Sequence, residues 1–426
     1  MRIFFLASNI PQRPHDTRAP SVLVHEAIRQ FVESGHEVVL QLILPEEERP
    51  LAEDEAANLR RMEEDRRVTL LPPLWATDIT RCGGARKGGR WDFSRAICYP
   101  YLHLGPVIAE RVRASAATFV FSMYSVPALP AACEVTGVPT GIFYGNLDHA
   151  PHSARLADGA LFDRARISLT ERVRQRWKLR AQRRWFFDMM SRYDLVWNSS
   201  ALDAAILRKS GVPQARYMQN MWPLPAAADH AAERRVCEQL DPFKICASIG
   251  GLQGTANTYG LDFLGRELAP LLAERLGFPF ELHVFGARQP TAAVARVLDH
   301  PSIRLRGFVE EIDRELLESP VFLVCNNAGR YKAQHTRFLH AWSLGSCIIA
   351  HADNRLTMPE LEHDRNVLLA GDAAEFARCI GRAAADRPLR ERIAAGGRET
   401  YLRHFSPPVV MKKLISEMAQ ARPAGH

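Results

Sequence analysis

The stretch FKICASIGGLQGTANTYG, residues 243–260, has the form of a buried strand, a glycine-rich loop and the start of a helix. The apolar run from Phe243 to Ile249 predicts a strand that is covered on both faces, as in parallel sheets. Three glycines after a strand allow backbone N–H groups to approach a phosphate closely, and a helix start adds its dipole. The glycines lack the spacing of the dinucleotide-binding fingerprint, so a plain tight turn explains them equally well.

Similar apolar runs continue on both sides of this stretch. Downstream lie FELHVFG, IRLRGFV, PVFLVCN and SCIIAHA, then a helical pattern over most of 375–404 and a last helix in VVMKKLISEMA. Upstream lie RIFFLAS, HEVVLQLIL, ATFVFSMY, TGIFYGN and DLVWNSS, separated by loop or helix signals. Buried strands that alternate with helices predict parallel sheets covered on both faces.

An Ala- and Pro-rich segment without strand character separates the two series, and it is the best linker candidate. The expected fold class is α/β, with two Rossmann-like doubly wound domains facing a central cleft. We expect the domains at 1–222 and 242–405, a linker at 223–241 and a final helical segment at 406–426.

The composition is that of an ordinary globular protein. The 426 residues are 47% hydrophobic and 24% charged, which excludes a disordered or fibrous chain. No apolar run approaches the roughly 20 residues needed to span a bilayer, and the N-terminal run predicts a buried strand rather than a signal peptide. The eight cysteines form no Cys-x-x-Cys pair, so we expect reduced core thiols in a cytoplasmic protein.

The formal charge of +7 is concentrated in one segment. Between Arg164 and Arg184 there are nine basic residues and a single acid, Glu171. Trp177, Trp185 and neighbouring apolar residues lie among them. This pattern fits a helix on an anionic membrane surface, and equally a core helix with an Arg-rich solvent face. Nucleic acid is not an expected partner, because such a role needs basic residues on several elements.

Two loops of the first half carry groups suited to general base chemistry. His15 and Asp16 lie in the loop 8–20, which otherwise fits a solvated surface loop. Asp148, His149 and His152 follow directly after a predicted strand, where a turn with a capping aspartate is the alternative.

The loop and helix in NNAGRYKAQHTRFLHAWSLGSCIIA, residues 326–350, give the most informative signal. Basic side chains enter the start of a helix, where cations oppose the helix dipole unless an anion is bound. A diphosphate would supply that anion, and four solvated basic side chains are the alternative. These residues are Arg330, Lys332, His335 and Arg337.

Other chemistries lack their motifs. The sequence has no GxxxxGK[ST] loop, no HExxH or paired Cys/His spacing and no GxSxG. An NTPase, a zinc site and a serine hydrolase are therefore not expected.

Several segments resemble the GT-B glycosyltransferases of the "glycosyl transferases group 1" class, of the bacterial polysaccharide type. The resemblance covers most of the chain, is clearest between Lys244 and Phe405 and is weak from Leu51 to Ala117. The segments that carry it are IGGLQGTANTYGLDFL, IRLRGFVEEIDRELLESPVFLV, HTRFLHAWSLGSCIIAH, MPELEHDRNVLLAGDAAEFA and YLRHFSPPVV, with SGHEVVL, SSALDAAILRKSGVP and YMQNMWP in the first half.

The resemblance implies a nucleotide-diphosphate sugar held mainly by the C-terminal domain and an acceptor at the N-terminal one. It also implies a final helix that crosses back to the N-terminal domain, and no requirement for a metal or other cofactor. Carried over by position, Gly250 and Gly251 would approach the phosphates, Lys332 and Arg337 would neutralise them, and Glu360 would lie near the sugar or ribose. Asn257 falls near the same loop, and Arg330 belongs to the neighbouring basic cluster.

The sequence departs from the family pattern at two places. Where many members have a Glu-x7-Glu pair, this chain has Lys332 and His340. The Arg and Lys usual after the first donor-domain glycines are absent from LQGTANTYG. Ribose and phosphate contacts must then be made differently, for which His340 and the Arg330–Arg337 cluster are candidates.

The expected function is transfer of a sugar from a nucleotide donor to a glycan or lipid-linked acceptor, in the cytoplasm or at the inner membrane. Most members of the resembled class retain the anomeric configuration, which needs no dedicated base. For an inverting enzyme, His149 or Asp148 would be the base, followed by His15 and Asp16. The alternatives are a nucleotide-sugar 2-epimerase on the same fold and a non-catalytic sugar-nucleotide or membrane-binding scaffold.

Overall fold

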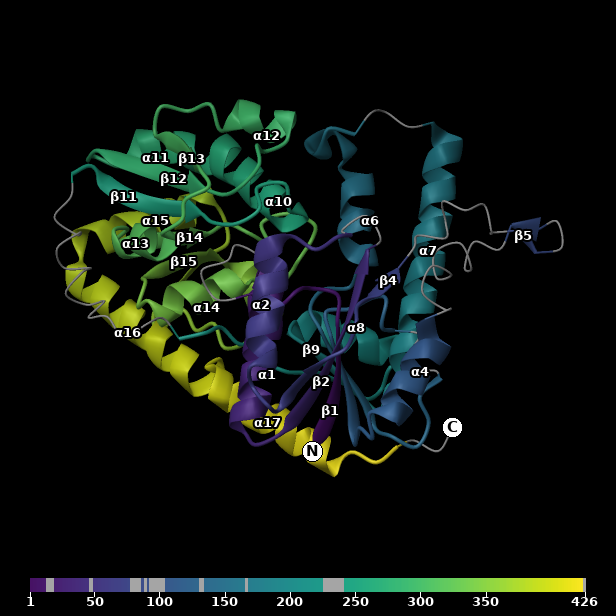
Figure 1. Ribbon diagram of the computed structural model, residues 1–426. Coiled ribbons are helices and arrows are strands. Elements are labelled where there is room, and N and C mark those ends of the chain that lie inside the picture. The colour runs from purple at the N-terminus through teal and green to yellow at the C-terminus, as the bar shows by residue number, and fades with distance from the viewer. Residues whose placement is uncertain are drawn as a thin grey trace. The chain divides into compact units, whose positions relative to one another are not determined.

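The computed structural model describes residues 1–12, 19–45, 49–76, 86–87, 90–91, 104–129, 134–164, 168–224 and 241–423. The chain forms two compact units (Figure 1). Unit 1 comprises Met1–His149, Leu169–Gln219 and Pro407–His426, and unit 2 comprises Ala150–Ser168 and Asn220–Ser406. Most of the expected linker at 223–241 lies outside the described residues, as do His15 and Asp16.

Unit 1 is built on a parallel sheet with the strand order β10-β9-β8-β7-β1-β2-β3, and β4 pairs with β2. Its core strands are buried because their residues are almost entirely apolar, as in RIFFLA and FVFSM. The strands are β1 (Arg2–Ala7), β2 (Glu37–Pro45), β3 (Val68–Leu70), β4 (Leu74–Ala76), β7 (Phe119–Met123), β8 (Thr140–Tyr144), β9 (Leu195–Asn198) and β10 (Ala215–Tyr217). A short antiparallel pair, β5 (Arg86–Lys87) and β6 (Arg90–Trp91), is separate from this sheet.

Helices connect these strands. They are α1 (Ala19–Glu33), α2 (Glu53–Glu63), α4 (Leu104–Ala114), α7 (Leu169–Ser191), α8 (Ala201–Lys209) and α17 (Pro407–Gln420), and α6 (His149–Ala157) starts at the end of the first segment. Although α17 comes last in the chain, it packs beside α1 (Figure 1). The fully buried Trp197 of β9 donates its Nε1–H to Glu417 of α17 at 2.7 Å. The final helix is therefore part of the first unit.

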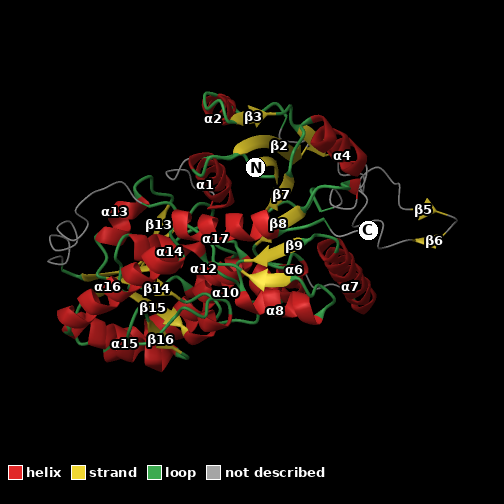
Figure 2. Cartoon of the chain, turned by 90° about the horizontal axis from the view of Figure 1, so that it is seen from below, coloured by secondary structure: helices red, strands yellow, loops and turns green. Residues whose placement is uncertain are grey.

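Unit 2 repeats the same design with the strand order β13-β12-β11-β14-β15-β16. Figure 2 shows its helices in red around its strands in yellow. The strands are β11 (Phe243–Ser248), β12 (Phe280–Phe285), β13 (Ile303–Gly307), β14 (Val321–Val324), β15 (Ile348–His351) and β16 (Leu368–Ala370). The helices are α10 (Thr255–Phe263), η4 (Leu264–Leu268), α11 (Ala269–Arg275), α12 (Ala292–Val297), α13 (Ile312–Leu317), α14 (Thr336–Ser343), η5 (Ala352–Leu356), α15 (Ala373–Ala385) and α16 (Arg387–His404), with η3 (Gly159–Phe162) from the earlier segment. Separate apolar cores lie on the two faces of the sheet.

Residues 150–168 belong to unit 2, whereas the sequence analysis placed them in the first domain. Arg155 donates to the hydroxyl of Thr255 at 2.8 Å, and Thr291 donates to the carbonyl of Leu161 at 2.9 Å. The Asp163 carboxylate accepts from the first backbone N–H groups of α12. These contacts join segments about 100 residues or more apart in sequence, so no local pattern reveals them.

The expected fold class, two doubly wound α/β domains, is confirmed. In each sheet the strand order reverses once, between β1 and β7 in unit 1 and between β11 and β14 in unit 2. Ligands of such sheets bind outside the carboxyl ends of the strands at this reversal. Among the residues described, no helix is long and apolar enough to cross a bilayer.

Candidate functional site

The strongest candidate site lies at the reversal point of the unit 2 sheet. The loop with Gly250 and Gly251 follows β11, and the loop with Asn326 and Asn327 follows β14. Because β11 and β14 are neighbours and parallel, the two loops meet at the same edge of the sheet. Arg337, the second residue of α14, extends its side chain to both loops.

Two side-chain amide groups hold the guanidinium group of Arg337. Its Nη1 donates to Asn326 Oδ1 at 2.8 Å, and its Nη2 donates to Asn257 Oδ1 at 2.6 Å. The two asparagines are themselves joined, since Asn326 Nδ2 donates to Asn257 Oδ1 at 2.7 Å. The side-chain amide nitrogen of Asn257, Nδ2, donates to the carbonyl of Gly251 at 2.7 Å. This network fixes the guanidinium group against the glycine loop.

Arg337 has no carboxylate partner within the part of the chain that is described. Burial lowers its pKa to about 10, and the buried thiols of Cys246 and Cys325 oppose this only weakly. The group is still cationic at pH 7. Removing a cation from water costs free energy, and neutral amides recover only part of it. A bound anion would offset the remaining cost.

The glycine loop brings open backbone next to this cation. Gly250 has φ +101°, a conformation that L side chains rarely adopt, and a Cβ there would lie 3.6 Å from Arg337 Nη2. A Cβ on Gly251 would meet no atom within 4 Å. The loop rests on Gly286 at the end of β12, where a Cβ would lie only 2.0 Å from the carbonyl oxygen of Gly250. Because Gly286 has no side chain, the glycine loop can pack directly against the end of β12, and this contact fixes the position of the loop.

Lys332 lies in the loop between β14 and α14 and is neutralised within unit 2. Its Nζ contacts Asp353 Oδ2 at 2.5 Å and the carbonyl of Asn327 at 2.5 Å. The buried side chain of Asn327 bonds to Ala333 and to Asn354, and the His335 ring lies 3.2 Å from its Oδ1. Burial, together with the charge of Arg337, lowers the pKa of His335 well below its usual value, so that ring is neutral at pH 7. The loop is therefore held by buried polar contacts.

The other predicted donor residues point to separate partners. Arg330 is exposed and pairs with Asp158 at 3.2 Å. His340 lies 2.5 Å from Asp313 of α13 and packs against the ring of Trp222 with centroids 5.1 Å apart. The carbonyl of Glu360 accepts from Asn366 at 2.8 Å. Of the residues expected at the donor, only Gly250, Gly251, Asn257 and Arg337 form one connected group.

In unit 1, Asp148 and His149 follow the buried strand β8, in line with the expected turn. The Tyr144 hydroxyl donates to the Asp148 carboxylate at 2.8 Å. Burial raises the pKa of Asp148 to about 6, partly offset by that hydrogen bond. Burial, and next the charge of Arg183, lowers the pKa of His149 to about 4. At pH 7 Asp148 is therefore mostly ionised and His149 mostly neutral. Both can accept a proton, as a base acting on the acceptor hydroxyl must.

Asp203 of α8 positions the loop that carries these two residues. Its buried carboxylate accepts a hydrogen bond from the backbone N–H of Leu147, and burial raises its pKa to about 7. The Nδ1 atom of His149 is buried and makes no hydrogen bond within the described structure. His152 lies on α6, where burial is the main cause of its lowered pKa.

Sequence reasoning missed the amide residues Asn326, Asn327 and Asn354, which organise the unit 2 site. The pair Asn326-Asn327, directly after a buried strand, was the available signal. No group of three or more His, Cys, Asp or Glu side chains in the described residues is arranged to hold a metal ion.

The comparisons with known proteins agree with this arrangement. Residues 244–386, from β11 to the end of α15, match the family model of the glycosyl transferases group 1. These residues of unit 2 thus resemble the glycosyl transferases group 1. No curated protein matches the chain in sequence.

Solved structures of GT-B glycosyltransferases share the fold of this chain. Sucrose-phosphate synthase from Thermosynechococcus elongatus has a TM-score of 0.63 at 12% identity, with 99% of each chain covered. HepE from Anabaena in complex with UDP-glucose has a TM-score of 0.60 at 12% identity, with 99% of this chain and 100% of that chain covered. A glycosyltransferase from Rickettsia africae has a TM-score of 0.61 at 10% identity, with 98% of each chain covered.

Proposed function

We propose that the protein is a glycosyltransferase that transfers a sugar from a nucleotide-diphosphate sugar to a hydroxyl group of a glycan or lipid-linked acceptor. The transfer retains the anomeric configuration, requires no metal, and serves the synthesis of a polysaccharide. The enzyme works in the cytoplasm, peripheral to the inner membrane.

The observation that carries this proposal is Arg337. Its guanidinium group is partly buried, lacks a carboxylate partner in the described residues and lies beside open backbone at Gly250 and Gly251. A diphosphate supplies the missing negative charge, and free N–H groups of a glycine loop are suited to its oxygens. HepE, which shares the fold, binds UDP-glucose.

In the proposed reaction the bond between the anomeric carbon and the donor diphosphate oxygen breaks, and the electron pair leaves with the nucleoside diphosphate. The acceptor oxygen bonds to the anomeric carbon on the same face, and its proton passes to the departing phosphate oxygen. Arg337 stabilises the charge that develops on the diphosphate, as preorganised donors do in other transfer reactions. Lys332 contributes to the same field.

The test is turnover of a panel of nucleotide sugars by the wild type, Arg337→Gln and Arg403→Gln. Arg403 is a matched control, because it is exposed on α16 and, among the described residues, pairs only with Glu399 of the same helix. We expect Arg337→Gln to lower kcat/KM by about 10²- to 10³-fold and Arg403→Gln to have no effect. Equal rates in all three would reject the donor site.

The same panel separates the alternatives. A 2-epimerase would consume donor without an acceptor, and a scaffold would bind the donor without releasing nucleoside diphosphate. Turnover that survives EDTA supports metal-independent transfer, and proton NMR of the first product reports whether the anomeric configuration is retained.

A further inference from the structure

Helix α7 is anchored to unit 1 only near its C-terminal end. Its buried residues are Phe186, Phe187, Met189 and Met190, and no residue from Leu169 to Trp185 is buried. The helix up to Trp185 is therefore a largely exposed arm that carries seven basic residues and one acid, Glu171 (Figure 1).

A single ridge runs along one face of this helix, exposed from Leu169 to Arg184 and buried at Phe187. Its members recur every three or four residues, so they lie on one face: Leu169, Val173, Trp177, Arg180, Arg184, Phe187 and Ser191. The first three are large apolar side chains that are 75%, 45% and 63% exposed. An exposed Leu-Val-Trp row flanked by basic residues is unfavourable in water and typical of a helix lying in a membrane interface.

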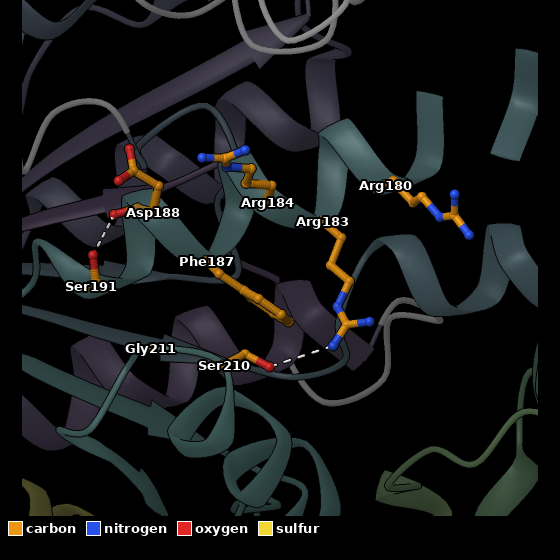
Figure 3. A pocket seen from close by; sticks show the side chains of 8 residues that line it. All are labelled: Arg180, Arg183, Arg184, Phe187, Asp188, Ser191, Ser210 and Gly211. Atoms are coloured by element: carbon orange, nitrogen blue, oxygen red, sulfur yellow. Dashed lines mark hydrogen bonds between the residues drawn. The ribbon is translucent and has the colours of Figure 1, made fainter. Parts of the chain in front are cut away.

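The ridge leads into a pocket of about 430 Å³ at the base of the arm. Arg180, Arg183 and Arg184 line it, with Phe187, Asp188 and Ser191 of the same helix and Ser210 and Gly211 after α8 (Figure 3). Arg183 extends over the Phe187 ring, 5.2 Å from its centroid, and donates to the Ser210 hydroxyl at 3.4 Å.

The pocket has an excess of positive charge. Within the described residues, none of its three arginines forms an ion pair, whereas Asp188 pairs with Arg192 at 3.2 Å. Three unneutralised guanidinium groups around one pocket suit a multiply charged phosphoryl group, which accepts several charge-assisted hydrogen bonds. Phe187 also packs edge-on against His149, 5.7 Å away, so the pocket adjoins the loop of Asp148 and His149.

We propose that this pocket binds the diphosphate group of a membrane lipid while Leu169, Val173 and Trp177 enter the bilayer interface. The occupant is a lipid because the apolar row and the pocket lie on one ridge, and a soluble phosphate would leave the row in water. The inference rests on the proposed function in one respect, since it identifies the lipid as the diphosphate-linked acceptor. Its sugar end would then approach Asp148 and His149.

The experiment is flotation of the full-length enzyme with three kinds of vesicle. One is phosphatidylcholine alone, one contains phosphatidylglycerol, and one contains a polyprenyl diphosphate at matched surface charge. The pocket variant is R180Q/R183Q/R184Q. The control R172Q/R176Q/K178Q removes the same charge from the same exposed arm away from the pocket.

We expect the two variants to lose the same amount of affinity for phosphatidylglycerol vesicles, because each loses three positive charges and non-specific attraction to an anionic membrane depends on net charge. On diphosphate vesicles the pocket variant should lose about tenfold more affinity than the control. Equal losses on both vesicles would overturn the proposal and leave a non-specific basic surface.

Two further arms identify the source of the phosphoryl group and separate this inference from the proposed function. L169S/W177S should lose vesicle binding but keep binding of inorganic pyrophosphate measured by calorimetry. If it keeps full vesicle binding, the ligand is a soluble phosphate and the lipid assignment fails. Without vesicles, the pocket variant should bind the nucleotide-sugar donor as the wild type does. If the wild type itself binds no donor, the proposed function fails, and the lipid proposal is judged by the vesicle results alone.

Discussion

Arg337 and Lys332 are both cations of the same loop and helix, but they differ in what neutralises them. Lys332 contacts the Asp353 carboxylate, whereas Arg337 contacts only neutral amides among the described residues. A bound anion would therefore stabilise Arg337 more than Lys332. In the proposed function Lys332 also contributes to the field at the diphosphate, and its contact with Asp353 makes that contribution smaller than the one from Arg337.

A double-mutant cycle separates these roles. If Lys332 contacts the diphosphate, Lys332→Ala should reduce kcat/KM for the donor by about 10²-fold, and the double variant K332A/D353N should stay equally impaired. Recovery of the double variant to within about tenfold of wild type would mean that Lys332 only neutralises Asp353. Asp353→Asn alone is the control for the carboxylate.

Asp148 gives a prediction about stability and pH. Burial raises its pKa to about 6, so ionisation costs the folded unit more than the unfolded chain. The stability it contributes is fully present below about pH 4 and is lost as the pH rises through about 6. Asp148→Asn keeps an acceptor for Tyr144 and cannot ionise.

This variant should be about 1 kcal/mol more stable than wild type at pH 8 and indistinguishable from it at pH 4. Urea denaturation at the two pH values measures the difference, with the exposed Asp188→Asn as control. A gain of the same size at both pH values would contradict the assigned cause. A loss of turnover beyond about 10²-fold would instead indicate a base and would argue against retention.

At the scale of elements, the sequence was sufficient for the long apolar strands and for the loops that follow them, but not for the short strands β3, β4, β5, β6, β10 and β16. Apolar runs such as FKICAS and VFLV are buried by composition alone, and the carboxyl ends of parallel strands share one edge. These rules place Gly250, Asn257 and Arg337 near one another before any coordinates are known.

The partners of the basic residues could not be predicted in this way. Asp353, Asp158 and Asp313 are separated from Lys332, Arg330 and His340 by 21, 172 and 27 residues. Which cation receives a carboxylate depends on where distant loops pack. For the same reason, local sequence did not assign residues 150–168 to unit 2.

The glycine loop after β11 depends on a glycine from another strand. A methyl group at position 286 would collide with the Gly250 carbonyl and the Leu252 side chain, so the loop must move. We expect Gly286→Ala to destabilise unit 2 by about 1 to 3 kcal/mol and to raise the KM for donor.

Gly277→Ala is the matched control, because a Cβ there meets no atom within 4 Å. It should change stability by no more than about 0.5 kcal/mol. Equal behaviour of the two variants in thermal unfolding and donor titration would show that the contact at Gly286 does not set the loop.

At the scale of the whole molecule, each unit has its own apolar core and its own sheet. We therefore expect calorimetry to resolve two unfolding transitions. A nucleoside diphosphate should raise only the transition of unit 2, by about 2.7 kcal/mol at 100 times its dissociation constant. Arg337→Gln should abolish this shift. A ligand-induced shift of the unit 1 transition would mean that the nucleotide binds unit 1 and would contradict a donor site in unit 2.

The packing of α17 on unit 1 has a consequence for biosynthesis. Most of unit 2 lies in sequence between two parts of unit 1, and α17 follows it. Because Glu417 of α17 accepts the hydrogen bond from buried Trp197, the core of unit 1 can be completed only after all of unit 2 has been translated.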